Sequence, residues 1–184
     1  MSDPLIRKPD DPQPEVAPLS ELCAGELEDL CDATIAAIEA GGGFGWIHVP
    51  PRDVLERYWQ GVLAMPARRV IAARLDGVIC GTCQLVKPPA NNEAQAHAVH
   101  LTTHFIAPWA RGYHLDEMIV HEAETAARDD GFSVINTDVR ETLSETIALY
   151  ERLGFEKIGT HPAYAVVDGE VLKGYHYYKS LTPL

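Results

Sequence analysis

Two apolar, β-rich segments, residues 69–75 and 78–86, are separated only by the dipeptide Asp76-Gly77. Asp-Gly favours a tight two-residue turn that joins neighbouring antiparallel strands. The sequence therefore predicts a β-hairpin near the middle of the chain. An isolated hairpin is not stable in water, so other segments have to extend it into a sheet and cover its apolar faces.

The remaining segments indicate what surrounds this hairpin. Helices are predicted over residues 20–40, 51–63, 113–130 and 144–153, and further strands over residues 95–107, 132–138, 155–160 and 171–180. Ser20 is a candidate cap for the first helix, and Gly41 and Gly131 end the first and third helices. This order predicts an α/β (α+β) fold with a mixed β-sheet and helices on both of its faces.

Length and composition limit the number of domains. The chain has 184 residues, 46% of them hydrophobic, which is enough for one core and too little for two ordinary domains. Residues 1–18 contain five prolines and show no periodicity, so we expect an extended or disordered lead-in before a single domain over residues 19–184. No long apolar run or signal-like start is present, and we therefore expect a cytoplasmic protein with no membrane span.

The net charge is −12, and residues 1–40 carry most of it, with ten acidic residues against two basic ones. No basic face is available to neutralise phosphates along a nucleic acid, so we do not expect a nucleic-acid partner. A small anionic cofactor is still compatible with this charge, because a few N–H groups and one or two basic side chains can bind a phosphate.

Four cysteines are present, and Cys80 and Cys83 have a spacing that is also found in redox and zinc motifs. This pair falls within a predicted strand, where an odd spacing directs the two side chains to opposite faces. No second pair with zinc-ligand spacing occurs. We therefore expect buried, reduced thiols and no metal site.

The segment from Ile106 to Phe155 carries the most specific pattern. It begins with Ile-Ala-Pro-Trp-Ala-Arg-Gly-Tyr-His-Leu-Asp, continues into a long predicted helix, and ends with Leu-Tyr-Glu-Arg-Leu-Gly-Phe. This run resembles the core of the Gcn5-related N-acetyltransferases (GNAT superfamily). The resemblance implies a splayed mixed β-sheet and an enzyme that transfers an acetyl group from acetyl-CoA to an amine.

In that family a loop of pattern Arg/Gln-x-x-Gly-x-Gly/Ala binds the CoA pyrophosphate at a helix N-terminus. Arg111 and Gly112 fit the pattern, whereas His114 and Asp116 replace the two glycines. Backbone groups of the preceding strand pair with the acyl-carrying arm of the cofactor. The resemblance thus implies the following cofactor-binding residues: Phe105, Ile106, Ala107, Arg111, Gly112, Tyr113, His114, Leu115 and Asp116.

Tyr150 matches the position where the family has a tyrosine that protonates the departing CoA thiolate. The alternative is a packing role beside Leu149 and Leu153. Alternation along a strand places His100, Thr102 and His104 on one face. Because imidazole titrates near neutral pH, His100 and His104 are candidate catalytic bases, with His97 and Glu93 in reserve. The histidines lack carboxylate support, so a metal role is not expected.

A closer resemblance, over about residues 20–181, is to the tabtoxin-resistance branch of the family. It rests on Gly-Gly-Gly-Phe-Gly after the first helix, the proline-led second helix, and the stretch from Gly159 to Tyr164. Branch members acetylate small amine-bearing compounds, which implies an acceptor pocket. The residues expected to line or contact the acceptor are Phe44, Trp46, Asp138, Arg140 and Tyr164.

Asp138 and Arg140 follow each other closely at the end of a predicted strand. The acid could bind a cationic amine and the arginine a carboxylate, or the two could form a salt bridge between loops. Two functions follow from the sequence: an N-acetyltransferase acting on a small-molecule amine, or a binding or regulatory module of the same fold with altered CoA binding. The oligomeric state stays open, a homodimer included.

Overall fold

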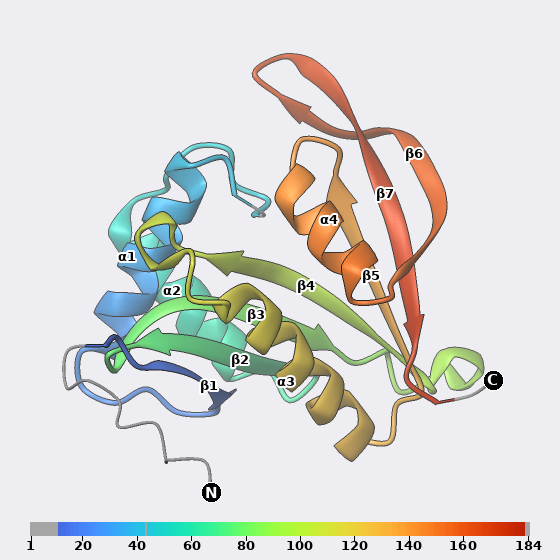
Figure 1. The fold of residues 1–184 in the computed structure, drawn as a ribbon, viewed down its shortest axis with the longest axis horizontal. Helices are drawn as coiled ribbons and strands as arrows, with labels where there is room; N and C mark the ends of the chain where they lie inside the picture. The colour runs from blue at the N-terminus through green and yellow to red at the C-terminus, as the bar shows by residue number, and fades with distance from the viewer. Residues whose placement is uncertain (1–10, 43, 183–184) are drawn as a thin grey trace, which may run out of the picture.

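The computed structural model describes residues 11–42 and 44–182. Seven strands form one sheet in the order β1-β2-β3-β4-β5-β7-β6 (Figure 1). The strands are β1 Pro14–Leu19, β2 Arg68–Leu75, β3 Val78–Val86, β4 Ala98–Ile106, β5 Val134–Arg140, β6 Glu156–Val167 and β7 Glu170–Ser180. The α-helices are α1 Glu26–Glu39, α2 Arg52–Leu63, α3 Leu115–Asp129 and α4 Ser144–Arg152.

The sheet is mixed, as predicted. β4 and β5 pair in parallel, and the other neighbouring strands pair antiparallel. The β2–β3 hairpin turns at Asp76 and Gly77, both of which have positive φ angles of 52° and 82°. This is the backbone conformation that the Asp-Gly dipeptide favours.

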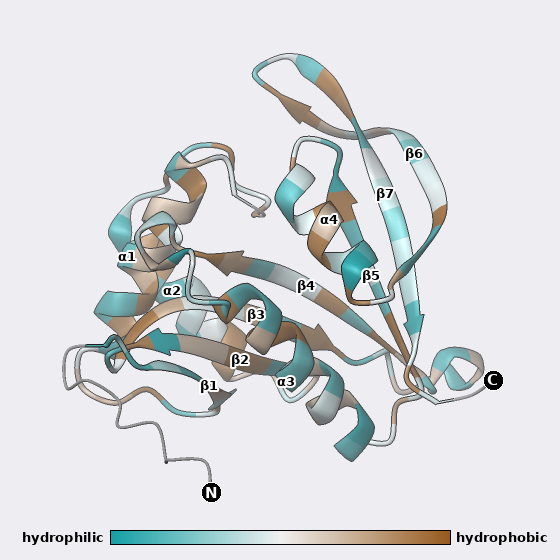
Figure 2. Cartoon of the chain, viewed as in Figure 1, coloured by the Kyte–Doolittle hydropathy of each residue, from teal (hydrophilic) through white to brown (hydrophobic). Residues whose placement is uncertain are grey.

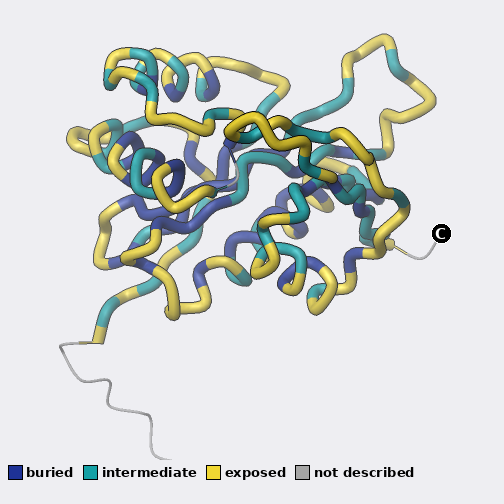
Figure 3. The backbone as a smooth tube through the Cα atoms, turned by 90° about the horizontal axis from the view of Figure 1, so that it is seen from above, coloured by how far each residue is buried: buried dark blue, intermediate teal, exposed yellow. Residues whose placement is uncertain are grey.

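Helices cover both faces of the sheet, which confirms the predicted architecture. Side chains of α1 and α2 form one buried cluster with one face of β2 and β3, and side chains of α3 and α4 form another cluster with the opposite face. The apolar colouring of β2, β3 and β4 in Figure 2 follows this double coverage. Figure 3 shows the buried backbone at the centre and the exposed turns at the periphery. No helix in the described part of the chain is long and apolar enough to cross a membrane.

The chain enters the sheet earlier than the sequence suggested. Residues 1–10 of the expected lead-in lie outside the described residues, but Pro14–Leu19 is strand β1 and pairs with β2 from Pro14↔Leu75 to Leu19↔Val70. The start at residue 19 is therefore too late for the described domain. Prolines are tolerated here because β1 is an edge strand, where half of the backbone N–H groups need no strand partner.

Helix α1 also begins later than expected, at Glu26 and not at Ser20. Gly25 precedes it with a φ of 87°, and the Glu26 carboxylate accepts a hydrogen bond from the Cys23 N–H at 2.8 Å. The same carboxylate forms an ion pair with Arg74 of β2 at 2.5 Å. The first residue of this helix thus makes both a local hydrogen bond and a contact with a segment distant in the sequence.

The prediction of buried thiols holds for Cys31, Cys80 and Cys83 but not for Cys23, which is exposed, and the predicted direction of the Cys80 and Cys83 side chains was wrong. All four thiols are free, and Cys80 and Cys83 are both buried in the cluster beneath α3. A register shift opposite Ala73 and Arg74 makes Cys80 an extra residue in β3 and reverses the alternation between the two cysteines. Burial raises the pKa of the Cys80 thiol to about 11, so it remains protonated at neutral pH.

Two features of the sheet determine where the candidate site lies. The β4–β5 ladder runs from Ala98↔Val134 to Leu101↔Thr137, and beyond it the two strands diverge (Figure 1). The β6–β7 hairpin extends past the body of the sheet as an arm whose tip carries the exposed side chains of Val166 and Val171. The β4 segment from Thr102 to Ile106 therefore lacks pairing to β5.

Candidate active site

Two cavities lie where β4 and β5 diverge. The larger has a volume of about 670 Å³ and is bounded by β4, the start of α3 and helix α4. The smaller has a volume of about 430 Å³ and is bounded by β4, β5, the α1–α2 loop and the β6–β7 arm. His104, Leu143 and Thr146 line both cavities, so the two meet at these residues.

The larger cavity contains most of the expected cofactor-binding residues. Those that line it are Phe105, Ile106, Arg111, Gly112, Leu115 and Asp116. Gly112 has a φ of 87°, and a Cβ built there would meet no atom within 4 Å. Glycine is therefore suited to this position by backbone conformation and not by lack of space.

Three expected cofactor-binding residues do not line this cavity. The Ala107 N–H donates a hydrogen bond to the Cys80 carbonyl at 2.7 Å, and its side chain is fully buried. The Tyr113 residue is 38% exposed and does not line the cavity. His114 is the N-cap residue of α3, with a φ of 60° and no side-chain capping bond. The N–H groups of the first turn of α3 therefore have no side-chain acceptor at this position.

The left-handed conformation of His114 allows a stability test. In this region the folded state of a non-glycine residue is destabilised by about 1–2 kcal/mol relative to glycine. Glycine recovers only part of this energy, because it loses more conformational entropy on folding. We expect His114→Gly to raise the free energy of unfolding by up to about 1 kcal/mol, measured by urea denaturation. His121→Gly, at an exposed position inside the same helix, is the control and should lower it. A loss of stability in His114→Gly would contradict the expectation.

Sequence reasoning did not find the contribution of α4 and of the end of α1. The larger cavity is also lined by Ala37, Ala40, Gly42, Thr142, Ser144, Glu145 and Arg152. Arg152 donates a hydrogen bond to Glu117 of α3 at 3.2 Å, which joins the two helices across one side of the cavity. The start of α4 was visible in the sequence, but its approach to α3 depends on tertiary packing.

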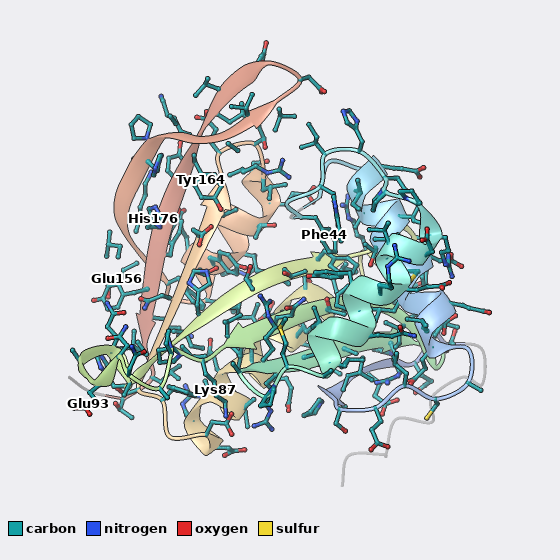
Figure 4. All side chains as sticks on the ribbon, turned by 180° about the vertical axis from the view of Figure 1, so that it is seen from behind. Phe44, Lys87, Glu93, Glu156, Tyr164 and His176 are labelled. Carbon is teal, nitrogen blue, oxygen red and sulfur yellow. The ribbon has the colours of Figure 1, made fainter. Side chains whose placement is uncertain are left out.

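The smaller cavity brings together four of the residues expected around the acceptor: Phe44, Asp138, Arg140 and Tyr164. In Figure 4, Phe44 lies on the side of the α1–α2 loop, while Tyr164 lies across the gap on the β6–β7 arm. Trp46 does not line this cavity. Its ring packs against Tyr58 with centroids 4.9 Å apart, so it supports the loop from behind.

Asp138 is the carboxylate of the smaller cavity. It accepts a hydrogen bond from His100 Nε2 at 2.9 Å through Oδ1 and another from the Tyr164 hydroxyl through Oδ2. These hydrogen bonds, that from His100 first, hold the pKa of Asp138 below its usual value and keep it ionised. His100 itself does not line either cavity and reaches the smaller one only through Asp138.

Arg140 is engaged with the backbone of the α1–α2 loop. Its guanidinium donates hydrogen bonds to the carbonyl of Gly42 at 2.6 Å and of Gly41 at 3.3 Å. The alternative of a salt bridge between Asp138 and Arg140 is therefore not what the structure shows. Arg140 instead connects β5 to the loop that closes one side of the smaller cavity.

Tyr150 lies at the back of the smaller cavity and is only 2% exposed. Its hydroxyl oxygen is 3.1 Å from His104 Nδ1. Burial raises the pKa of this phenol well above its usual value, so it keeps its proton at neutral pH. The ring of Tyr150 also packs against Phe155 with centroids 5.1 Å apart, so Tyr150 has a packing role, and its role as an acid stays a prediction.

The expectation that His100, Thr102 and His104 share one face is wrong. The register between β3 and β4 shifts at this point, and Thr103 has a φ of 51°. This bulge interrupts the alternation, so His104 contacts Tyr150 of α4 while His100 contacts Asp138 on the other face. Burial lowers the pKa of His104 to about 4, although the Asp116 carboxylate opposes this shift.

The two reserve candidates lie outside the site. Glu93 is exposed and belongs to a short 3₁₀ turn, Glu93–Gln95, which Figure 4 shows far from Phe44 and Tyr164. His97 is exposed as well, and its carbonyl accepts hydrogen bonds from Ser133 and Val134. Among the residues the structure describes, no group of three or more His, Cys, Asp or Glu side chains is arranged to hold a metal ion.

Known proteins resemble this chain in sequence or in fold. An uncharacterized N-acetyltransferase from the hisH-hisA intergenic region of Azospirillum brasilense is 56% identical over 124 residues, which are 67% of this chain and 74% of the relative. The fold resembles an N-acetyltransferase from Staphylococcus aureus Mu50 (TM-score 0.77, 12% identity, covering 92% of this chain and 99% of that one). It also resembles the yncA protein of Salmonella typhimurium, solved with its cofactor acetyl-CoA (TM-score 0.74, 14% identity, 92% and 94% covered).

The structural likenesses establish the fold alone, because their sequence identities are low. The Azospirillum relative is far more similar in sequence, and residues 33–155 match the acetyltransferase (GNAT) family. That match includes the whole of the altered cofactor loop and the helix that carries Tyr150. The chain belongs to the acetyltransferase (GNAT) family.

Proposed function

We propose that this protein transfers the acetyl group of acetyl-CoA to the amine of a small molecule, with Tyr150 as the general acid. The observation that carries the proposal is the meeting of two cavities at the point where β4 and β5 diverge. The Tyr150 hydroxyl group belongs to the smaller cavity, next to His104, which lines both. A donor in one cavity and an acceptor in the other would react beside this phenol.

The residues of the larger cavity fit acetyl-CoA. The β4 segment from Thr102 to Ile106 has an edge that β5 does not use, which suits pairing with the amide groups of the pantetheine arm. The first turn of α3 offers N–H groups that can bind an anion, and Arg111 and Arg152 add positive charge. Asp116 and Glu145 reduce the affinity for phosphate without blocking the cavity.

The smaller cavity fits an acceptor that carries a positive charge before it reacts. Asp138 is ionised there and attracts the ammonium group of the acceptor. We propose that the pair formed by Asp138 and His100 takes up the amine proton, as the resemblance implied for His100. The His100 side chain is 42% exposed, so it can pass this proton to solvent.

Acetyl-CoA supplies an activated acetyl thioester, and the remaining requirement is a proton for the departing sulfur. Tyr150 holds a proton at neutral pH. Because Tyr150 is only 2% exposed, this proton does not exchange freely with bulk water. Burial raises the pKa of a thiol as well as that of a phenol, so a CoA thiolate that forms beside Tyr150 in the same water-poor site is a base that can take up this proton. This matches the role of a general acid that acts late in the reaction.

The size of the smaller cavity, about 430 Å³, suits a small molecule. Phe44 gives it an apolar wall, and Tyr164 and Asp138 give it a polar one. An acceptor with an amine beside a short apolar segment would match both walls. We therefore propose that the protein belongs to the tabtoxin-resistance branch of the family, whose members acetylate small amine-bearing compounds.

Asp116 also supports a second function, that of a binding or regulatory module. Its carboxylate is exposed on the larger cavity, where the family pattern has a glycine. A ligand with less negative charge than a pyrophosphate would avoid the repulsion that this carboxylate imposes. The two functions differ in whether acetyl-CoA binds at all.

Calorimetric titration with acetyl-CoA separates the two functions. We expect binding in the micromolar range, weakened in Arg111→Ala, because Arg111 lines the larger cavity. Arg128→Ala is the matched control, since Arg128 lies in the last turn of α3, and it should bind like the natural protein. If neither the natural protein nor Asp116→Asn binds acetyl-CoA, the transferase proposal is rejected. If binding is seen, a panel of small amines is screened by the release of free CoA thiol.

A further inference from the structure

The β6–β7 arm departs from regular strand pairing where it borders the smaller cavity. Regular pairing stops at His161↔Gly174 and resumes at Ala165↔Leu172. Three residues of β6, 162–164, therefore lie opposite a single residue of β7, so β6 contains a bulge of two extra residues. Bulges change the direction of side chains and are common next to active sites.

The bulge brings Tyr164 to Asp138 of β5. The Tyr164 hydroxyl donates a hydrogen bond to Asp138 Oδ2, and both side chains line the smaller cavity. Pro162 has no N–H group to pair, and the Ala163 N–H donates to His161 Nδ1 at 3.2 Å. The bulge thus meets part of its backbone hydrogen bonding within β6 itself.

Gly174 of β7 leaves the space that the Tyr164 ring requires. A Cβ built at Gly174 would lie 2.2 Å from Cγ, 2.4 Å from Cδ2 and 2.7 Å from Cβ of Tyr164, which are its three nearest atoms. The ring therefore lies directly against the backbone of β7. Glycine weakens the interior of a strand and often marks the close approach of another group. The bulge and the glycine both disfavour a regular hairpin, and the placement of this one side chain requires both.

Asp138 has one donor on each carboxylate oxygen. His100 Nε2 of β4 lies 2.9 Å from Oδ1, and the Tyr164 hydroxyl of β6 donates to Oδ2. The terminal torsion of an aspartate is broad, so a single donor restrains the carboxylate plane little, whereas two donors from separate strands fix it. An ionised carboxylate has about four lone-pair sites, so two of them remain for an incoming ammonium group.

The charges around Asp138 agree with this arrangement. The hydrogen bond from His100 lowers the pKa of Asp138 most, that from Tyr164 adds to the shift, and burial opposes both. Burial raises the pKa of Tyr164 well above its usual value, and the Asp138 carboxylate raises it further, although Arg140 opposes the shift. The phenol therefore keeps its hydrogen at neutral pH and is the donor. His176 of β7 also favours the ionised form of Asp138.

We propose that Tyr164 is a positioning residue, whose hydroxyl, together with His100, holds the Asp138 carboxylate in the orientation that receives the ammonium group of the acceptor. Gly174 and the bulge are the features of the arm that allow this contact. A carboxylate that is oriented before binding loses less freedom when the amine arrives. The role toward the amine rests on the proposed acetyl transfer, whereas the packing of Tyr164 against Gly174 does not.

A packing role for Tyr164 is the alternative. Its ring meets the rings of His161 and His176 at centroid distances of 6.2 and 6.4 Å, and Figure 4 shows Tyr164 and His176 together on the arm. Phenylalanine would preserve these ring contacts and lose only the hydrogen bond to Asp138. The two roles therefore differ in the effect of Tyr164→Phe.

A double-mutant cycle tests the arrangement without turnover. We expect Gly174→Ala to lower the urea midpoint of unfolding by about 1 M, because the new methyl group displaces the Tyr164 ring. In a Tyr164→Ala background, where the ring is absent, Gly174→Ala should have no such effect. Gly159→Ala, in the same hairpin, is the control, since a Cβ there would meet no atom within 4 Å. Equal losses of stability in both backgrounds would overturn the proposed placement of the ring.

Kinetics test the role toward the amine. Butylamine and phenethylamine are the probes, and the release of CoA thiol is measured with saturating acetyl-CoA. We expect Tyr164→Phe to lower kcat/KM for the amine about ten- to a hundredfold, mainly through a higher KM. Gly174→Ala should show a similar loss, and Gly159→Ala should show none. The dissociation constant of acetyl-CoA should stay the same, because Tyr164 does not line the larger cavity.

The outcomes separate this inference from the proposed function. If Tyr164→Phe leaves kcat/KM for the amine unchanged, or weakens acetyl-CoA binding by the same factor, the positioning role is rejected. If the natural protein acetylates no amine, the role toward the amine fails with the proposed function. Coupling between Gly174 and Tyr164 in the stability cycle would still support the placement of the ring.

Discussion

Replacing Tyr150 by phenylalanine is expected to lower kcat for acetyl transfer by about 10²- to 10⁴-fold, the usual contribution of a general acid. The change removes only the hydroxyl group. The ring keeps its contacts with Phe155 and Tyr177, whose centroids lie 5.1 and 6.4 Å away. The dissociation constant of acetyl-CoA should change little, because the larger cavity does not include Tyr150 among its lining residues.

The measurement combines initial rates, calorimetric binding and thermal unfolding. Tyr177→Phe is a matched control, since Tyr177 is also buried, at 1% exposure, and its hydroxyl donates to Glu151 at 2.9 Å away from both cavities. Both variants lose one buried hydroxyl group, so their stability losses should be similar, at about 1 kcal/mol. If Tyr150→Phe retains more than half of the natural kcat, Tyr150 is a packing residue and another acid must be sought.

Replacing Asp116 by asparagine is expected to tighten acetyl-CoA binding about tenfold, with an upper bound near a hundredfold. A carboxylate about 6 Å from a phosphate charge is repelled by roughly 2–3 kcal/mol at an effective dielectric constant near 20. Because Asp116 is exposed, solvent and salt reduce this repulsion, and we expect about half of it to be measured. Asparagine removes the charge while it keeps the size of the side chain.

Calorimetric titration at low and at high salt tests this prediction. The gain in affinity should shrink as the salt concentration rises, since the repulsion is screened. Asp129→Asn removes the same charge at the other end of α3 and should leave affinity unchanged, because about 20 Å of helix separates it from the cavity. An Asp116→Asn variant that binds no better than the natural protein would mean that this carboxylate points away from the bound phosphates.

Asp116 also bears on stability. An acidic residue in the first turn of a helix interacts favourably with the helix dipole, by about 0.3–1 kcal/mol. Asp116→Asn should therefore lose a little stability as it gains affinity. This opposition gives a physical reason for an acid at a position where the family pattern has glycine: the residue supports the start of α3 at the expense of phosphate binding.

Local sequence signals determined most of the secondary structure. The Asp76-Gly77 turn between apolar runs predicted β2 and β3, and Pro51 and Gly131 marked the start of α2 and the end of α3. These signals work because backbone conformation at a turn or helix end depends on the residue itself. The family pattern added Tyr150 and the cofactor loop. Of the five residues expected around the acceptor, four line the smaller cavity and Trp46 does not.

The features that the sequence missed depend on pairing between distant segments. β1 is a strand because β2 offers it a partner, and the Glu26 carboxylate at the start of α1 forms an ion pair with Arg74 of β2. Neither contact leaves a local pattern in the sequence. The same holds for Arg140, whose guanidinium binds the carbonyls of Gly41 and Gly42, nearly a hundred residues earlier in the chain.

The sequence by itself determined the family, the order of the central elements and the chemical types that surround the site. Only the tertiary structure decided which face each side chain occupies, because an extra residue in a strand reverses the alternation that follows it. One such bulge brings Cys80 and Cys83 into the same cluster, and another separates His104 from His100. Bulges form where neighbouring strands and helices pack best, so the contact between His104 and Tyr150 is a product of the whole sheet.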